Sequence, residues 1–148
     1  MPQTHASINL HVVHGTKGRL ELIPPEIMPR LCAYLGGVAH HRKAMLLAAG
    51  GMPDHLHMLL SVHPTTAPSD LVRDLKANSS RWFRETLGRR FAWQAGFGEF
   101  AVSASNLDVV RRYINNQAKH HAKMSFVDEY LAMLKRHRVE YDPRYVFD

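Results

Sequence analysis

Two histidines, His55 and His57, stand at alternate positions of an apolar segment, with the residue type and spacing of a metal site. Side chains of a β-strand point alternately to its two faces, so both imidazoles would project from one face. Imidazole nitrogens are common ligands of divalent metal ions. Residues 51–62 therefore carry a candidate metal site, although two histidines on a half-buried strand can equally be structural.

A second group with potential chemistry lies on a helix that the capping pattern at Ser105 and Asp108 predicts. Tyr113 and Gln117 are four residues apart, which places them only about 40° from each other around an α-helix. His120 continues the same row. A phenol can serve as a nucleophile, and the carboxamide oxygen one turn away can bind a metal ion. His120 can be a further ligand, a proton acceptor or a solvated histidine.

Hydrophobic periodicity predicts the elements that must position these residues. We expect strands at 8–14, 43–49, 54–62 and 100–103, with a short return strand at 20–23. We expect helices at 24–40, at 70–87 with Ser69 as its cap, from residue 105, and at 125–137. Gly50 and Gly51 predict the turn of a hairpin. In the strand that carries the histidines, the opposite face is fit for a core and holds Leu56, Met58, Leu60 and Val62.

Length, charge and cysteine content limit the class of protein. The chain has 148 residues, which suits a single domain over residues 1–148. Its net charge of +6 favours a polyanionic partner, with nucleic acid before membrane. A single cysteine excludes an internal disulfide framework and suits a reducing cytoplasm. We expect no membrane-spanning segment and no secretion signal.

Several basic and aromatic residues are candidates for contacts with nucleic acid. The helix at 70–87 has a row of cations, which can be either a phosphate-binding face or an ordinary solvated one. The loop at 89–100 mixes arginines with aromatic residues, which can stack on unpaired bases or pack the loop onto the domain. The DNA-contact candidates are Arg73, Lys76, Arg84, Trp93, Arg111 and Arg112.

The segment GMPDHLHMLLSV followed by RRYINNQAKHH resembles the single-tyrosine HUH transposases of small bacterial insertion sequences and their REP-associated relatives. HUH denotes two histidines around a bulky apolar residue, here His55-Leu56-His57. The resemblance extends over residues 8–121. It implies an α+β fold, a ferredoxin-like βαββαβ domain with an antiparallel sheet, followed by C-terminal helices that carry the tyrosine.

The resemblance also implies an activity. His55, His57 and Gln117 would hold Mg²⁺ or Mn²⁺, and Tyr113 would attack single-stranded DNA to give a 5′-phosphotyrosine and a free 3′-OH, a link that permits rejoining. The substrate would be hairpin-bearing element ends, and the enzyme a homodimer whose subunits can share an active site. We expect it in the cytoplasm, associated with the nucleoid when it acts on DNA.

Two alternatives stay open on the sequence. One is a REP-associated, host-retained endonuclease with the same chemistry. The other is a catalytically silent nucleic-acid-binding module of ferredoxin-like fold, in which His55, His57 and Tyr113 are structural residues. Replacement of the tyrosine by phenylalanine separates the enzyme from the silent module, because only the enzyme loses a covalent adduct with DNA.

Overall fold

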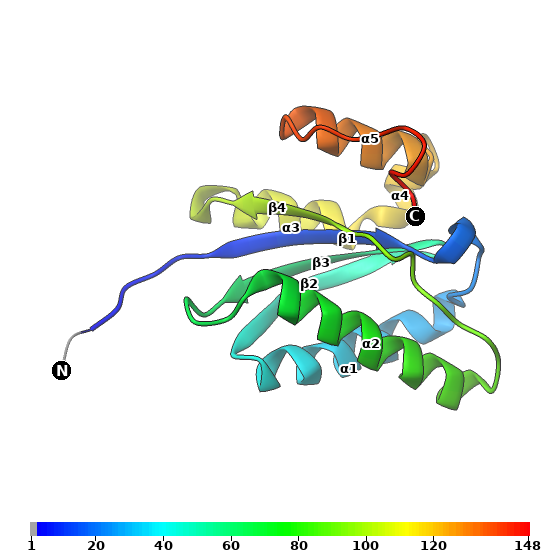
Figure 1. Cartoon of the computed structure of the whole chain (residues 1–148), viewed down its shortest axis with the longest axis horizontal. Coiled ribbons are helices and arrows are strands. Elements are labelled where there is room, and N and C mark those ends of the chain that lie inside the picture. Colours follow the sequence, from blue (N-terminus) through cyan, green and yellow to red (C-terminus); the bar gives the residue numbers. More distant parts are fainter. Residues whose placement is uncertain (1–2) are drawn as a thin grey trace.

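The computed structural model describes residues 3–148 and follows the order β-α-β-β-α-β, then three helices (Figure 1). This confirms the predicted α+β class with an antiparallel sheet. The strands are β1 (Asn9–Gly15), β2 (Ala44–Met52), β3 (His55–Val62) and β4 (Gly98–Val102). The helices are α1 (Met28–His41), α2 (Pro68–Leu87), α3 (Leu107–Asn115), α4 (Gln117–His121) and α5 (Phe126–Arg136). Short 3₁₀ turns lie at Lys17–Arg19, Pro25–Ile27 and Ala104–Asn106.

The four strands form one antiparallel sheet in the order β2-β3-β1-β4. The histidine strand β3 is therefore central, and β1 lies beside it with Val13 opposite His57. Helices α1 and α2 cover one face, and α3, α4 and α5 lie on the other (Figure 1). This arrangement gives the sheet two buried faces with different partners.

Alternation along β3 separates an apolar core from a polar layer. Leu56, Met58, Leu60 and Val62 belong to the cluster that α1 and α2 cover, as the sequence pattern predicts. His55 and His57 are equally buried but face the C-terminal helices. A smaller apolar cluster on that side surrounds Val13 and Phe100 and anchors α5 to the sheet through Phe126, Tyr130, Met133 and Leu134.

The Gly50-Gly51 pair does not form the predicted hairpin turn. Both glycines are within β2, and the turn follows at Pro53 and Asp54. The reason is close packing. A Cβ on Gly51 would overlap the carbonyl oxygen of His55, and one on Gly50 would lie 3.0 Å from the carbonyl oxygen of Ile114 in α3. Gly50 thus permits the close approach of the tyrosine helix to the sheet, and Gly51 lies against the backbone of His55.

Other local predictions were also wrong. Residues 20–23 form no strand, because their backbone runs past the β2–β3 turn, where the amides of Leu22 and Ile23 both bond to the carbonyl of Pro53. Helix α2 begins at Pro68, before Ser69, and α3 begins after a 3₁₀ turn that includes Ser105. A break at Asn116 separates α3 from α4. Ser125 does cap α5, accepting a hydrogen bond from the amide of Asp128.

Candidate metal and tyrosine site

His55 and His57 are both fully buried, and each has a second residue that orients its ring. The Nδ1–H of His55 donates to Asp54 at 2.7 Å. His57 has its Nδ1 2.8 Å from Nε2 of His11, on the neighbouring strand β1. In both histidines Nδ1 is therefore engaged and Nε2 points to the same space. This is the usual arrangement of histidines that bind a metal ion through Nε2.

Burial keeps the imidazoles of His57 and His11 neutral. It lowers the pKa of His57 below the ordinary histidine value, against the opposing effect of Glu129. It lowers the pKa of His11 to about 3, with a further decrease from the charge of His57. A neutral imidazole has a free lone pair, so both rings are in the state that metal binding and acceptance of a hydrogen bond require.

The tyrosine helix brings Tyr113 and Gln117 to this pair within one chain. Ile114 is buried against β2 and fixes the rotation of α3. The rings of Tyr113 and His57 have centroids 5.7 Å apart with edge-to-face geometry. The side-chain oxygen of Gln117 lies 3.0 Å from Nε2 of His55. The two sequence motifs, 56 residues apart between His57 and Tyr113, thus meet in space.

Sequence reasoning missed two members of the site, His121 and Glu129. Together with His55 and His57 they form a group whose potential ligand atoms all lie within 4.8 Å of one another. Glu129 is on α5, only 1 % exposed, with one carboxylate oxygen 2.9 Å from Nε2 of His57. His121 lies 3.1 Å from the same oxygen and 2.9 Å from the oxygen of Gln117. Three imidazoles and a carboxylate can hold a divalent metal ion.

A signal for Glu129 exists in the sequence. Helix α5 buries Phe126, Tyr130, Met133 and Leu134, which recur at helical spacing. Glu129 falls in the same stripe, three residues after Phe126 and four before Met133. A carboxylate at a core position of an amphipathic helix requires partners, because burial of an unpaired charge is costly.

Glu129 links the metal group to the tyrosine. Its second oxygen accepts a hydrogen bond from the hydroxyl of Tyr113. Burial would raise the pKa of Glu129, but the contacts of His57 and Tyr113 hold this pKa far below the ordinary value. Burial and the adjacent carboxylate raise the pKa of Tyr113. The resting state is therefore a carboxylate that holds a neutral phenol beside the histidines.

His120 occupies a different place from His121. Its Nε2 lies 3.3 Å from the hydroxyl of Tyr113, and its side chain is 30 % exposed. Among residues 3–148, the compact group of potential ligands includes His121 and not His120. Of the roles that the sequence leaves open for His120, the geometry favours a partner of the phenol.

Two of the six DNA-contact candidates are engaged inside the domain. Trp93 is buried, packs edge-to-face against Phe91 and donates its indole N–H to Ser79 at 2.9 Å, so its ring is not available to unpaired bases. The ammonium of Lys76 donates to three carbonyls of the loop, those of Gln94, Ala95 and Gly96. Burial lowers the pKa of Lys76 to about 8. The loop at 89–100 therefore packs onto the domain.

The four arginines among the candidates are exposed but lie on two different sides. Arg73 and Arg84 belong to α2, which lies across the sheet from α3 (Figure 1). Arg73 pairs with Asp70 at 3.2 Å, and Arg84 donates to Ser80. Arg111 and Arg112 precede Tyr113 on α3. Only these two are on the helix that carries the candidate nucleophile.

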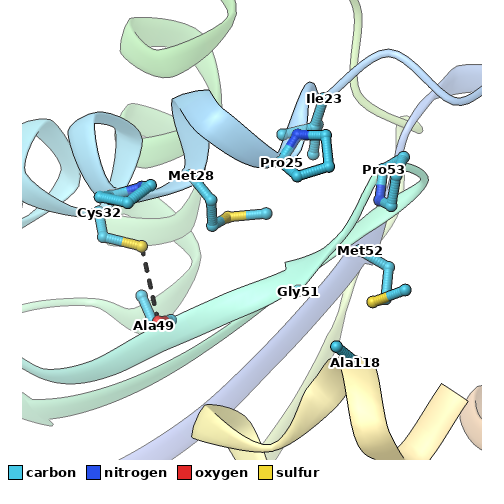
Figure 2. A pocket seen from close by; sticks show the side chains of 10 residues that line it. Ile23, Pro25, Met28, Cys32, Ala49, Gly51, Met52, Pro53 and Ala118 are labelled. Carbon is cyan, nitrogen blue, oxygen red and sulfur yellow. Dashed lines mark hydrogen bonds between the residues drawn. The ribbon is translucent and has the colours of Figure 1, made fainter.

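A separate cavity of about 500 Å³ lies between α1 and β2, with Ala118 of α4 at its border (Figure 2). Met28, Cys32 and Met52 are among its lining residues, and the thiol of Cys32 donates to the carbonyl of Ala49. No charged side chain lines it. Among its described lining residues the titratable group is the Cys32 thiol, whose pKa burial raises, whereas the histidines and Glu129 gather on the other side of the sheet.

Comparisons with known proteins agree with this geometry. The family model for IS200-like transposases matches residues 4–117. The ISDra2 transposase TnpA of Deinococcus radiodurans is 26 % identical over 117 residues, which is 74 % of this chain and 84 % of that protein.

Two solved structures share the fold. A putative transposase from Deinococcus radiodurans R1 has a TM-score of 0.63 at 24 % identity, covering 79 % of this chain and 98 % of that one. A REP-associated tyrosine transposase bound to a REP hairpin has a TM-score of 0.57 at 16 % identity, covering 84 % and 76 %.

No helix within residues 3–148 is both long and apolar enough to cross a membrane.

The match to the family model over residues 4–117 spans most of the chain and ends at Gln117, so it includes the histidine strand and the tyrosine helix. His121 and Glu129 lie beyond it. The chain belongs to the IS200-like transposase family, whose members act in DNA transposition.

Proposed function

We propose that this chain is a metal-dependent tyrosine transposase that cuts and rejoins single-stranded DNA, with Tyr113 as the nucleophile. One observation carries the proposal. Within a single chain, Glu129 contacts both the hydroxyl of Tyr113 and the Nε2 of His57. A nucleophile and a cation-binding group that share one carboxylate are placed to act on the same phosphate.

The donor set fits a divalent metal ion. His55 and His57 would hold it through Nε2, and Gln117, His121 and Glu129 offer the remaining donors at the same point. When bound, the ion supplies positive charge that polarises the scissile phosphate. A set rich in imidazole favours Mn²⁺ over Mg²⁺, since Mg²⁺ prefers oxygen ligands.

The chain's own residues account for the remaining steps. The oxygen of Tyr113 attacks phosphorus in line, the bond from phosphorus to the 3′ oxygen breaks, and the product is a 5′-phosphotyrosine with a free 3′-OH. The phenol proton leaves along its hydrogen bonds to Glu129 and His120, and the departing 3′ oxygen takes a proton from solvent. Attack of a 3′-OH on the phosphotyrosine reverses these steps and rejoins the strand.

The substrate is single-stranded DNA with a hairpin. An unpaired backbone gives access to a phenol that is half-buried between α3 and the sheet. The relative solved with a REP hairpin supports a hairpin beside the cleaved strand. Because Tyr113 reaches the histidines of its own chain, cleavage in cis is favoured. A homodimer is proposed on the family resemblance, with each subunit carrying a complete site.

Covalent trapping tests this proposal. The probe is a pool of single-stranded oligonucleotides with a randomised segment beside a hairpin, incubated with Mn²⁺. We expect a protein–DNA adduct on a denaturing gel with the wild-type chain, none with Tyr113→Phe, and none after chelation of the metal. Tyr141→Phe is the matched control, because Tyr141 is exposed in the C-terminal tail. DNA binding without any adduct would instead support the silent module.

A further inference from the structure

A second cavity, of about 300 Å³, opens directly beside Tyr113. It lies between β4, α3 and the C-terminal end of α5, and His11 forms part of its wall. A volume at the lower end of the range for ligand pockets suits one small planar group and excludes several stacked ones. The cavity therefore adjoins the candidate active site and has room for about one nucleotide.

The walls of this cavity have the chemistry that an unpaired base requires. Phe100 and His137 stack with ring centroids 4.3 Å apart, and Nδ1–H of His137 donates to the carbonyl of Met133, which holds the ring in place. Phe100 is buried behind His137, and the exposed ring of His137 offers the aromatic platform on which an unpaired base can stack. Within residues 3–148, Nε2 of His137 has no hydrogen-bond partner and can contact a base edge.

The backbone of β4 adds hydrogen-bonding groups. β4 is the edge strand of the sheet, paired with β1 on one side only, and its residues from Phe100 to Val102 line the cavity. Outward N–H and C=O groups of an edge strand are free to pair with a ligand.

Arg136 supplies positive charge at the same place. It lines the cavity, and its charge acts on both Tyr113 and His11. A guanidinium at this point can bind the phosphate that joins the enclosed nucleotide to the strand. Arg136 and His137 lie beyond the part of the chain that the family model matches, so this wall belongs to the C-terminal segment of this protein.

We propose that this cavity is a binding pocket for the single unpaired nucleotide next to the scissile phosphate, and that it sets a base preference at the cut. The inference rests on the proposed function and adds a site of sequence selection within the protein. His137 binds the base, with Phe100 supporting its ring from behind, the edge of β4 contacts the polar rim of the base, and Arg136 holds its phosphate.

Sequencing of trapped adducts tests the pocket. Adducts from the randomised single-stranded pool are isolated, and base frequencies are compared at each position around the cut. For the wild-type chain we expect enrichment of about tenfold at one position adjacent to the cut, the size that one hydrogen bond at a base edge allows. Val110→Trp fills the cavity from α3 and is expected to abolish the enrichment.

Variants at the exposed C-terminal end of α5 provide a second test. This test does not depend on whether the protein tolerates the larger side chain of Val110→Trp. His137→Ala and His137→Phe are both expected to abolish the base preference, because both remove Nε2, whereas His137→Phe keeps a ring for stacking and is expected to retain more of the adduct yield. Arg136→Gln is expected to reduce adduct yield several-fold at low DNA concentration, whereas Lys135→Gln, its exposed neighbour outside the cavity, is expected to behave as wild type.

The outcomes separate the two proposals. Adducts without base preference beside the cut, or a preference that persists in both Val110→Trp and His137→Ala, would overturn the pocket and leave the tyrosine chemistry intact. Absence of any adduct with the wild-type chain would contradict the proposed function, and the pocket with it.

Discussion

The two faces of the sheet are equally buried and yet have opposite chemistry. On one face Leu56 and Met58 pack against α1 and α2, and on the other His55 and His57 meet the C-terminal helices. Burial of the first face is favourable through the area removed from water. Burial of the second is favourable only because Asp54, His11 and Glu129 satisfy its polar atoms. Because side chains alternate along β3, one face of this strand contributes to stability and the other carries the candidate site.

The largest expected contrast comes from neighbouring residues of β3. We expect His57→Ala to reduce adduct formation by at least about a thousandfold, since it removes a proposed metal ligand and the contact with Glu129. We expect Met58→Ala to cost about 2–5 kcal/mol of unfolding free energy through the cavity it leaves, with adduct formation retained in the folded fraction. Urea unfolding and gel-based adduct yield measure the two effects. Equal loss of adduct formation in both variants would contradict the different roles assigned to the two faces of the sheet.

The approach of the tyrosine helix to the sheet gives the next prediction. Gly50→Ala places a Cβ 3.0 Å from the carbonyl oxygen of Ile114, so α3 and Tyr113 must move by a few tenths of an ångström. We expect about a tenfold decrease in the rate of adduct formation with DNA affinity nearly unchanged, because catalysis depends steeply on position. Single-turnover kinetics measures the rate, and fluorescence anisotropy the affinity.

Gly37→Ala is the matched control for this substitution. Gly37 is an exposed position of α1 with no heavy atom within 4 Å of an added Cβ. Alanine there is expected to stabilise the helix by up to about 1 kcal/mol and to leave the rate unchanged. A similar fall in rate for both glycine variants would refute the positioning role of Gly50.

The local patterns could be predicted from the sequence, and the long-range partners could not. The alternation of β3 and the spacing of Tyr113 and Gln117 are properties of short segments, so the elements that carry them could be predicted. Glu129 reaches His57 across 72 residues, and only its place in the apolar stripe of α5 indicates burial. No local rule pairs that stripe with the face that holds the histidines.

The glycine pair and the basic residues show the same limit. Gly50 and Gly51 have the composition of a turn, but α3 packs over one and the His55 backbone over the other. Lys76 has the spacing of a solvated cation, but its ammonium closes the loop at 94–96. In each instance tertiary packing determines the role, and local propensity does not include it.

Acid sensitivity is a further test of the polar face. His11 has a pKa of about 3 in the folded chain because of burial, against an ordinary value of 6.5. A depressed histidine pKa stabilises the fold above 6.5, and this contribution is lost as the pH falls from 6.5 towards 3. Between about pH 7 and about pH 5 we expect unfolding free energy to fall by up to about 2 kcal/mol more in wild type than in His11→Gln.

Urea unfolding at several pH values measures this difference. His63→Gln is the control, because His63 is in an exposed loop and its side chain bonds to the neighbouring Thr65. Parallel pH profiles for wild type and His11→Gln would contradict the assignment of His11 to the buried polar layer.

The smallest expected effect concerns the salt dependence of DNA binding. Arg111 is on the tyrosine helix and Arg73 on the opposite side of the sheet. If DNA lies on the C-terminal helix face, Arg111→Gln should reduce the slope of log affinity against log salt concentration by roughly 1, and Arg73→Gln should leave it unchanged. A reduced slope only for Arg73→Gln would place the DNA on α2.

The identity of the residue joined to DNA tests the central claim most directly. Adducts formed in Mn²⁺ are digested with protease and nuclease, and the modified peptide is sequenced by mass spectrometry. The account predicts a nucleotide linked through its 5′ phosphate to Tyr113. A nucleotide on Tyr130, Tyr141 or any other residue, or linkage through a 3′ phosphate, would contradict it.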